Sequence, residues 1–194
     1  MEHEQLIRRV LGTNFLDLKF GRLVVDEDPD AGTSVRLTVV EGDGRHEVEG
    51  KGVGIIDALH AGLLARYARE YQSLTTIRLI GFHVSADIET KKGSSGVDAV
   101  AQVTVDVSNS EGKHFAFTDA SRSMITSSAR VVIAMTQYFM NAERAFVTLY
   151  NARRDALQRG REDLVTRYTR EMSEVVESTS YADVIANIRK EVGG

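Results

Sequence analysis

The chain has 194 residues, of which 42% are hydrophobic and 27% are charged, and its formal net charge is −4. This composition is typical of a globular protein, and the net negative charge argues against nonspecific binding of nucleic acid. The absence of cysteine excludes disulfides, thiolate metal sites and cysteine nucleophiles, and no apolar run is long enough for a transmembrane helix.

The first 13 residues predict a helical arm. Apolar residues recur at three- and four-residue spacing within residues 4–12, which is the pattern of a short amphipathic helix. The segment from Met1 to Gln5 is acidic and lacks the basic and apolar regions of a signal peptide. We therefore expect a cytoplasmic protein that does not contact a membrane.

Extended segments follow the arm. Residues 34–40 alternate between apolar and polar side chains, which indicates a strand with one buried face. Before this strand, residues 26–32 are acidic and contain the only proline, so they predict a turn. After it, Gly42-Asp43-Gly44 predicts a hairpin. The predicted extended segments are residues 15–20, 23–25, 34–40 and 46–49.

Alternate glycines then lead into a helix that is predicted to reach about Tyr71. Gly50, Gly52 and Gly54 leave the backbone bare, and a carboxylate at Asp57, in the first turn, suits the positive end of the helix dipole. An amide-rich helix start of this kind can receive a carboxylate or a phosphate. The alternative is a strand-to-helix corner with favourable caps and no ligand. The helix carries an apolar stripe flanked by the small residues Ala58, Ala61, Gly62 and Ala65, which let a neighbour approach closely.

The same order of elements recurs in the second half of the chain. The alternation from Ala99 to Val107 is the most regular in the sequence and predicts a strand. A long helix is predicted from about Ser121 to about Tyr150. Two such halves indicate an α+β fold of two pseudo-twofold βββα units with helices on one side of the sheets. The predicted strands of this half are residues 76–89, 99–107 and 113–118.

Beyond residue 150 the chain becomes strongly charged, and its apolar spacing predicts two more helices, over about residues 164–176 and 181–188. This helical extension needs a surface on which to bury its apolar face. We therefore divide the chain into an N-terminal helical arm, a central α+β domain and a helical C-terminal extension. Their ranges are residues 1–13, 14–150 and 151–194.

No pattern in the sequence assembles a catalytic or metal site. The five histidines lack the spacing of HExxH or HxH. Gly52 and Gly54 are not followed by the third glycine of the dinucleotide fingerprint. Asp57 and His60, three residues apart on one helix, are the remaining acid–base option, but no metal site or activated nucleophile accompanies them. We expect no catalytic residue, no metal and no cofactor.

Three segments, in this order, resemble the regulatory domain of 2-isopropylmalate synthases and citramalate synthases. Residues 48–59, VEGKGVGIIDAL, resemble its glycine-rich G-x-G-P-V-D-A segment. Residues 95–105, SGVDAVAQVTV, resemble its G-x-D-A-x-A-x-V-x-V strand, and the helix around Ser127-Ser128-Ala129 resembles its A-S-x-x-A helix. The match covers about residues 14–142, so the central domain is identified as a regulatory and dimerisation domain of this type.

The resemblance implies two βββα units, a homodimer, and a leucine or isoleucine effector bound near the dimer interface beside the glycine-rich helix start. In the family, binding there inhibits a separate catalytic barrel, an acyltransferase, which this chain lacks. The chain would then regulate a separate catalytic chain and perform no catalysis itself. The residues that we expect to bind the effector are Gly52, Gly54, Ile55, Ile56, Asp57, Ala58 and Ser123.

The chemistry of an amino-acid zwitterion fits these positions. The backbone amides from Gly52 to Ile56 would bind the carboxylate, and Asp57 or a carboxylate of a dimer partner would bind the ammonium group. Small residues such as Ala58 would leave room for a branched side chain.

Departures from the family keep a second hypothesis open. Ile55 and Ile56 stand where the family has proline and valine, and Ser123, with Asp119 nearby, stands where it has an acidic residue close to the effector. The terminal asparagine of the family's second helix falls near Gln137. The alternative is therefore a structural dimer module that has lost amino-acid binding and docks on a separate partner chain.

Overall fold

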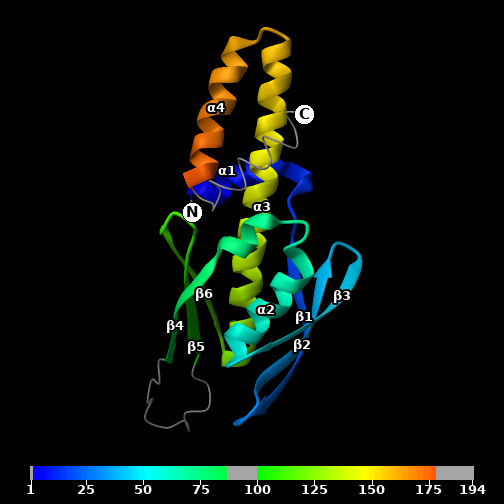
Figure 1. Cartoon of the computed structure of the whole chain (residues 1–194), viewed down its shortest axis with the longest axis vertical. Coiled ribbons are helices and arrows are strands. Elements are labelled where there is room, and N and C mark those ends of the chain that lie inside the picture. The colour runs from blue at the N-terminus through cyan, green and yellow to red at the C-terminus, as the bar shows by residue number, and fades with distance from the viewer. Residues whose placement is uncertain (1, 87–99, 178–194) are drawn as a thin grey trace, which may run out of the picture.

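The computed structural model describes residues 2–86 and 100–177, and Figure 1 shows how their elements are arranged. The first half contains α1 (Glu2–Leu11), the 3₁₀ turn η1 (Gly12–Asn14), β1 (Leu18–Asp28), β2 (Gly32–Glu41), β3 (Gly44–Gly52) and α2 (Ile55–Tyr67). The second half contains the 3₁₀ turn η2 (Gln72–Thr76), β4 (Arg78–Ala86), β5 (Ala101–Ser108), β6 (His114–Ser121), α3 (Met124–Gln158) and α4 (Glu162–Glu177).

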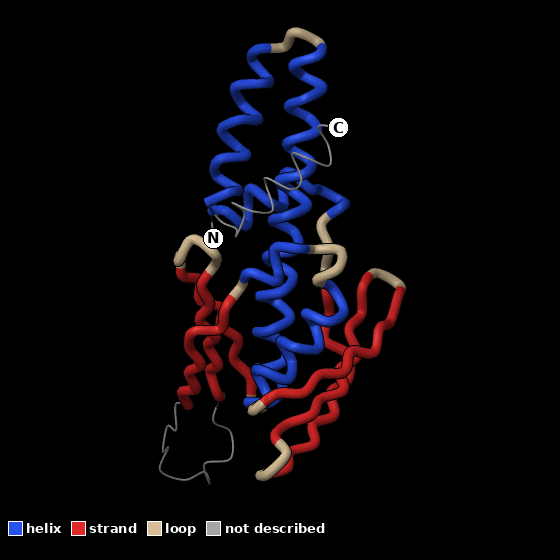
Figure 2. Tube along the Cα trace, viewed as in Figure 1, coloured by secondary structure: helices blue, strands red, loops and turns tan. Residues whose placement is uncertain are grey.

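The strands form two antiparallel sheets, in the orders β1-β2-β3 and β4-β5-β6. Figures 1 and 2 show α2 and the sheet-facing half of α3 between the two sheets. Among the described residues, helices cover only the inner face of each sheet. The predicted α+β fold of two βββα units with a C-terminal helical region is confirmed.

The central strand of each sheet supplies much of the core. Alternate side chains of β2 and β5 are buried on the inner face, where they join the buried residues of α2 and α3 in one apolar cluster. Each such side chain contributes about 1.5–3 kcal/mol through burial. The strand residues concerned are Val35, Leu37, Val39, Val103, Val105 and Val107.

The first strand is longer than the sequence predicts. Residues 15–20 and 23–25 suggest two extended runs, whereas β1 is one strand whose register with β2 shifts between Phe20 and Leu23. Gly21 allows this bulge, because a Cβ there would lie 2.8 Å from the Thr38 carbonyl oxygen. The predicted turn over residues 26–32 is also shorter than expected, since β1 continues to Asp28.

A 3₁₀ turn replaces the predicted start of the fourth strand. The prediction begins this strand at residue 76, but η2 occupies residues 72–76 and β4 begins at Arg78. Glu143 of α3 holds the turn, because its Oε2 accepts hydrogen bonds from the Ser73 backbone N at 3.0 Å and from Ser73 Oγ at 2.6 Å. Burial raises the pKa of the Glu143 carboxyl, and the two Ser73 hydrogen bonds oppose that shift.

The helical region is built around the far half of α3, which projects beyond the sheets (Figure 1). The predicted helix ends near Tyr150, whereas α3 runs on to Gln158, and the predicted domain boundary at 150/151 falls inside it. A second apolar cluster joins this half of α3 to α1 and α4. Glu171 of α4, almost fully buried, pairs with Arg9 of α1 at 3.2 Å. The extension thus buries its apolar face on α3 and the N-terminal arm; the helix predicted over residues 181–188 lies outside the described residues.

Candidate functional site

The predicted effector site is the corner between β3 and α2. Gly54 is the N-cap of α2, with φ −145° and ψ 179°, and its carbonyl accepts a hydrogen bond from Ala58 N at 3.0 Å. Glycine has no side chain that could accept a hydrogen bond, so Gly54 does not cap the amides in the first turn of α2. Val53 is 92% exposed. The corner is therefore partly open to solvent at the end of α2 where the helix dipole favours an anion.

Most of the glycines around this corner have a packing role. A Cβ on Gly50 would overlap the Ala58 carbonyl oxygen, and one on Gly52 would lie 2.5 Å from Ala58 N. A Cβ added to Gly62 of α2 would likewise lie only 2.9 Å from Val48 Cγ1 of β3. Glycine at these positions lets β3 cross close over α2. Gly54 differs, because a Cβ there would meet nothing within 4 Å.

This packing determines which predicted site residues are accessible. Ile56 and Ala58 are buried, and β3 of the same chain occupies the space that Ala58 and Gly62 leave beside the helix. Gly52, Gly54 and Ile55 are half-buried, and Asp57 is exposed. The accessible part of the corner therefore runs from Gly52 to Ile55 together with Asp57.

Ser123 occupies the equivalent place in the second unit. It is the N-cap of α3, and its Oγ accepts a hydrogen bond from Thr126 N at 3.2 Å. Both α2 and α3 begin at the same end of the molecule, the lower end in Figure 1. Ser123 thus caps its own helix, and its contact with an effector stays a prediction.

The acid–base option on α2 gains little from the geometry. His60 is largely buried, and this burial lowers the pKa of its imidazole, although the Asp57 carboxylate opposes the shift. A lowered pKa leaves His60 neutral at pH 7. Among residues 2–86 and 100–177, no group of three or more His, Asp or Glu side chains could hold a metal ion. Within the same ranges, no helix has the length and apolar character needed to cross a bilayer.

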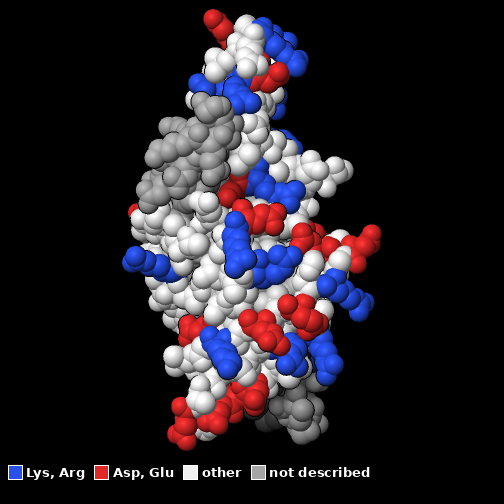
Figure 3. Space-filling model, turned by 45° about the vertical axis from the view of Figure 1, so that its right-hand side comes forward, with Lys and Arg blue, Asp and Glu red and all other residues white. Residues whose placement is uncertain are grey.

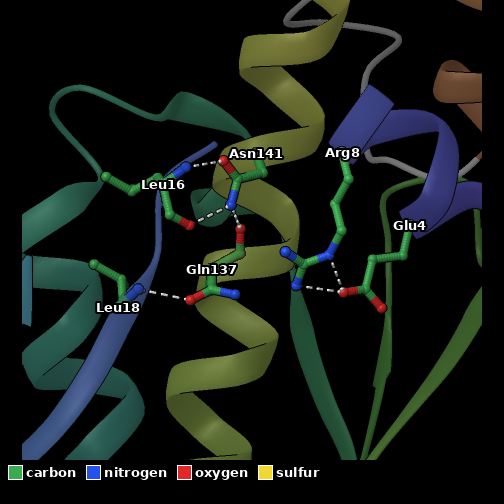
Figure 4. A network of polar contacts seen from close by, with 6 residues as sticks. All are labelled: Glu4, Arg8, Leu16, Leu18, Gln137 and Asn141. Atoms are coloured by element: carbon green, nitrogen blue, oxygen red, sulfur yellow. Dashed lines mark hydrogen bonds and ion pairs between the residues drawn. The ribbon is translucent and has the colours of Figure 1, made fainter. Parts of the chain in front are cut away.

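Two amide side chains of α3 hold Leu16 and the start of β1 against this helix, and the sequence patterns predict neither contact (Figure 4). Asn141 accepts a hydrogen bond from Leu16 N and donates one to Leu16 O, both at 2.8 Å, and Gln137 Oε1 accepts from Leu18 N at 2.7 Å. Four helical residues rise about 6 Å and two strand residues about 6.6 Å. Because these two distances are nearly equal, Gln137 lies opposite Leu18 and Asn141 lies opposite Leu16. The sequence carries no signal for this contact, because the burial of Asn141 is visible only in the structure.

The surface carries charges of both signs. On the face shown in Figure 3, Lys and Arg side chains are interspersed with Asp and Glu side chains. One exposed pair is Arg36 with Glu49, which joins β2 to β3 at 2.9 Å. This face therefore lacks the continuous basic stripe that binds a phosphate backbone.

Comparison of the chain with models of known protein families gives no match, and comparison with curated proteins gives none either. The likeness to the isopropylmalate synthase regulatory domain therefore depends on the three sequence segments quoted above and on the order of the elements.

Proposed function

We propose that this protein is an effector-binding, dimerising regulatory module for branched-chain amino-acid biosynthesis, which acts on a separate catalytic chain. The observation that supports this most is the pair of βββα units with a glycine-rich, uncapped β3–α2 corner. This is the architecture that the sequence resemblance implies.

In this proposal the effector's carboxylate binds the amides that follow Gly54, at the positive end of α2. Asp57, exposed in the same turn, is the acceptor for the ammonium group. Because β3 already fills the space beside Ala58, the effector's side chain lies on the outer side of the corner. A second copy of the chain completes the pocket there.

The exposed edge of β4 supports a homodimer. β4 pairs with β5 on one side, and Ile80, Phe82 and Val84 along it are 48%, 43% and 42% exposed. The β1 edge, by contrast, carries the charges of Lys19, Arg22 and residues 26–28. Charged edges resist pairing between chains, whereas an apolar edge favours it. Two β4 strands pairing antiparallel would form a twofold interface.

Isothermal titration calorimetry with leucine, isoleucine and valine tests effector binding. We expect binding of at least one, and at least tenfold weaker binding to Gly54→Asp, because the new carboxylate takes the amides and repels the ligand's carboxylate. Gly54→Ala is the matched control and should bind like the wild type, since nothing lies within 4 Å of its Cβ. Absence of heat and of a thermal shift at millimolar ligand would reject effector binding.

Light scattering coupled to size-exclusion chromatography tests the dimer. We expect Phe82→Lys to yield a folded monomer, because it places a charge in the middle of the apolar edge. Leu157→Lys, at a 52% exposed position on the projecting part of α3, is the control and should stay dimeric. A monomeric wild type, or a dimeric Phe82→Lys variant, would contradict pairing through β4.

The projecting α3–α4 hairpin favours the second candidate, a structural dimer that docks on a partner chain. A cleft of about 480 Å³ opens on the hairpin, and its lining combines the apolar Phe146, Tyr150, Met172 and Val176 with the polar Arg153, Thr169 and Ser173. Under this candidate the protein is a dimer and binds none of the three amino acids. The two measurements above therefore separate it from the first.

A further inference from the structure

A cleft of about 360 Å³ lies where the two units meet, between β1, β6 and α3. We call it the inter-unit cleft. One face of α3 contributes to it at the helical spacing i, i+3, i+4 and i+7, with Arg130, Ile133, Ala134 and Gln137. Residues 17–20 of β1 and its approach, and Asp119 of β6, complete the lining.

Asp119 is an acidic residue at an inward-facing strand position. Inward and outward residues alternate along β6, and Asp119 pairs with Val103, which is fully buried. Its Oδ2 is buried and has no hydrogen-bond partner in the part of the chain that the structure describes. A buried carboxylate oxygen without a partner is costly. Such an atom calls for a donor that the chain does not supply.

Arg130 brings the opposite charge to the same cleft. It is exposed, and no described residue forms a hydrogen bond or ion pair with its guanidinium. Arg130 and Asp119 thus line one cleft without pairing with each other. Gln137 is already engaged, because its Oε1 accepts from Leu18 N and fixes the β1 wall.

The two unpaired charges select the ligand class. A cation would be repelled by Arg130, and a phosphate or carboxylate by Asp119, whereas a zwitterion satisfies both through charge-assisted hydrogen bonds. Leu18, Phe20, Ile133 and Ala134 supply the apolar part of the lining. The volume lies within the range of small-molecule sites.

We propose that the inter-unit cleft binds an α-amino acid with an apolar side chain, with its ammonium group on Asp119 and its carboxylate on Arg130. The site is distinct from the β3–α2 corner and lies within one chain. This inference rests on the proposed function only in that the cleft and the corner would bind the same class of ligand, an amino acid. Bound there, the ligand joins β1, β6 and α3, and so couples its occupancy to the relative position of the two units.

Calorimetry on the full chain with leucine, methionine and phenylalanine tests this, with two analogues of leucine. These are 4-methylpentanoate, which lacks the ammonium group, and isopentylamine, which lacks the carboxylate. In Gly54→Asp, where the corner is blocked, we expect one site per chain with at least a tenfold preference for the amino acid over either analogue, and the cleft variants are made in this background. Asp119→Asn should remove the preference over 4-methylpentanoate, and Arg130→Gln the preference over isopentylamine. A merely structural role would move neither preference.

Two control variants locate the site. Arg22→Gln, an exposed β1 residue outside the cleft lining, and Gly54→Asp, at the corner, should keep the wild-type preferences. The inference is overturned when Asp119→Asn and Arg130→Gln keep both preferences in the Gly54→Asp background, or when Gly54→Asp alone loses binding, an outcome that leaves the proposed function intact. Binding of methionine or phenylalanine in the cleft, without binding of any branched-chain amino acid, supports the inference and contradicts the proposed function. Wild-type protein that binds no amino acid overturns both.

Discussion

In each unit, two residues connect the third strand to the helix that follows it. The two connections differ in how the strand packs on the helix and in how the start of the helix is capped. At the first corner, Val53 and Gly54 join β3 to α2, and glycines bring strand and helix into backbone contact. At the second, Arg122 and Ser123 join β6 to α3, and the Ser123 side chain caps the helix. The first amides of α2 therefore have no side-chain cap from the preceding residue, whereas at the start of α3 the Ser123 side chain caps the amide of Thr126.

The packing behind the corners differs in the same way. In the second unit, Phe115 and Phe117 of β6 pack on Tyr138 and Phe139 of α3, with ring centroids 5.3–6.0 Å apart. In the first unit, Gly50 and Gly62 take the place of such rings between β3 and α2. An aromatic layer separates strand from helix, whereas glycines let them touch. The thin layer of the first unit thus lies next to the solvent-exposed start of α2, where Val53 is 92% exposed.

The largest effect is expected from removing the aromatic layer of the second unit. Phe139 is fully buried, so Phe139→Ala should lower the free energy of unfolding by about 4 kcal/mol through lost burial and a cavity. Urea unfolding followed by circular dichroism measures this loss. The control, Leu157→Ala, removes a side chain that is 52% exposed and should change stability by less than about 0.5 kcal/mol. Equal effects of the two substitutions would mean that the layer does not hold the second unit together.

The next effect is expected from separating strand and helix in the first unit. Gly50→Ala places a methyl group on the Ala58 carbonyl oxygen. Neither atom can move by a side-chain rotation, so β3 must shift away from α2. We expect a loss of about 3 kcal/mol in the same unfolding experiment. Gly54→Ala adds the same methyl group where nothing lies within 4 Å, so its loss should stay below about 1 kcal/mol. A tolerated Gly50→Ala would remove the packing explanation for the glycines.

The sequence was sufficient where a pattern reports local burial. The alternation of Val35, Leu37 and Val39, and that of Val103, Val105 and Val107, located the two central strands, because strand periodicity follows which face is buried. The α+β arrangement follows from the order of these strands and the two helices. The length of α3 was underestimated, since the charged residues after Tyr150 lie in a helix whose other face is buried by α1 and α4.

The parts of the candidate site that were not predictable depend on contacts between distant segments. The sequence cannot say whether Gly50 and Gly52 serve a ligand or a close approach of β3, because both uses require a missing Cβ. Asn141 looks like an ordinary polar helix residue until Leu16 is found opposite it. The unpaired charges of Asp119 and Arg130 likewise become informative only when β6 and α3 bring them into one cleft.

The smallest effects come from exchanging the two caps, and they sharpen the comparison most directly. Ser123→Gly removes the acceptor of Thr126 N, whereas Gly54→Ser supplies one to α2 at a residue whose extended φ and ψ suit an N-cap. Because glycine is itself a fair N-cap, we expect each exchange to change the free energy of unfolding by a few tenths of a kcal/mol, with opposite signs. Ser123→Ala, the reference for a true loss of the cap, should cost about 1 kcal/mol. If Gly54→Ser does not stabilise the protein, the amides of α2 already have acceptors, and the difference between the two corners disappears.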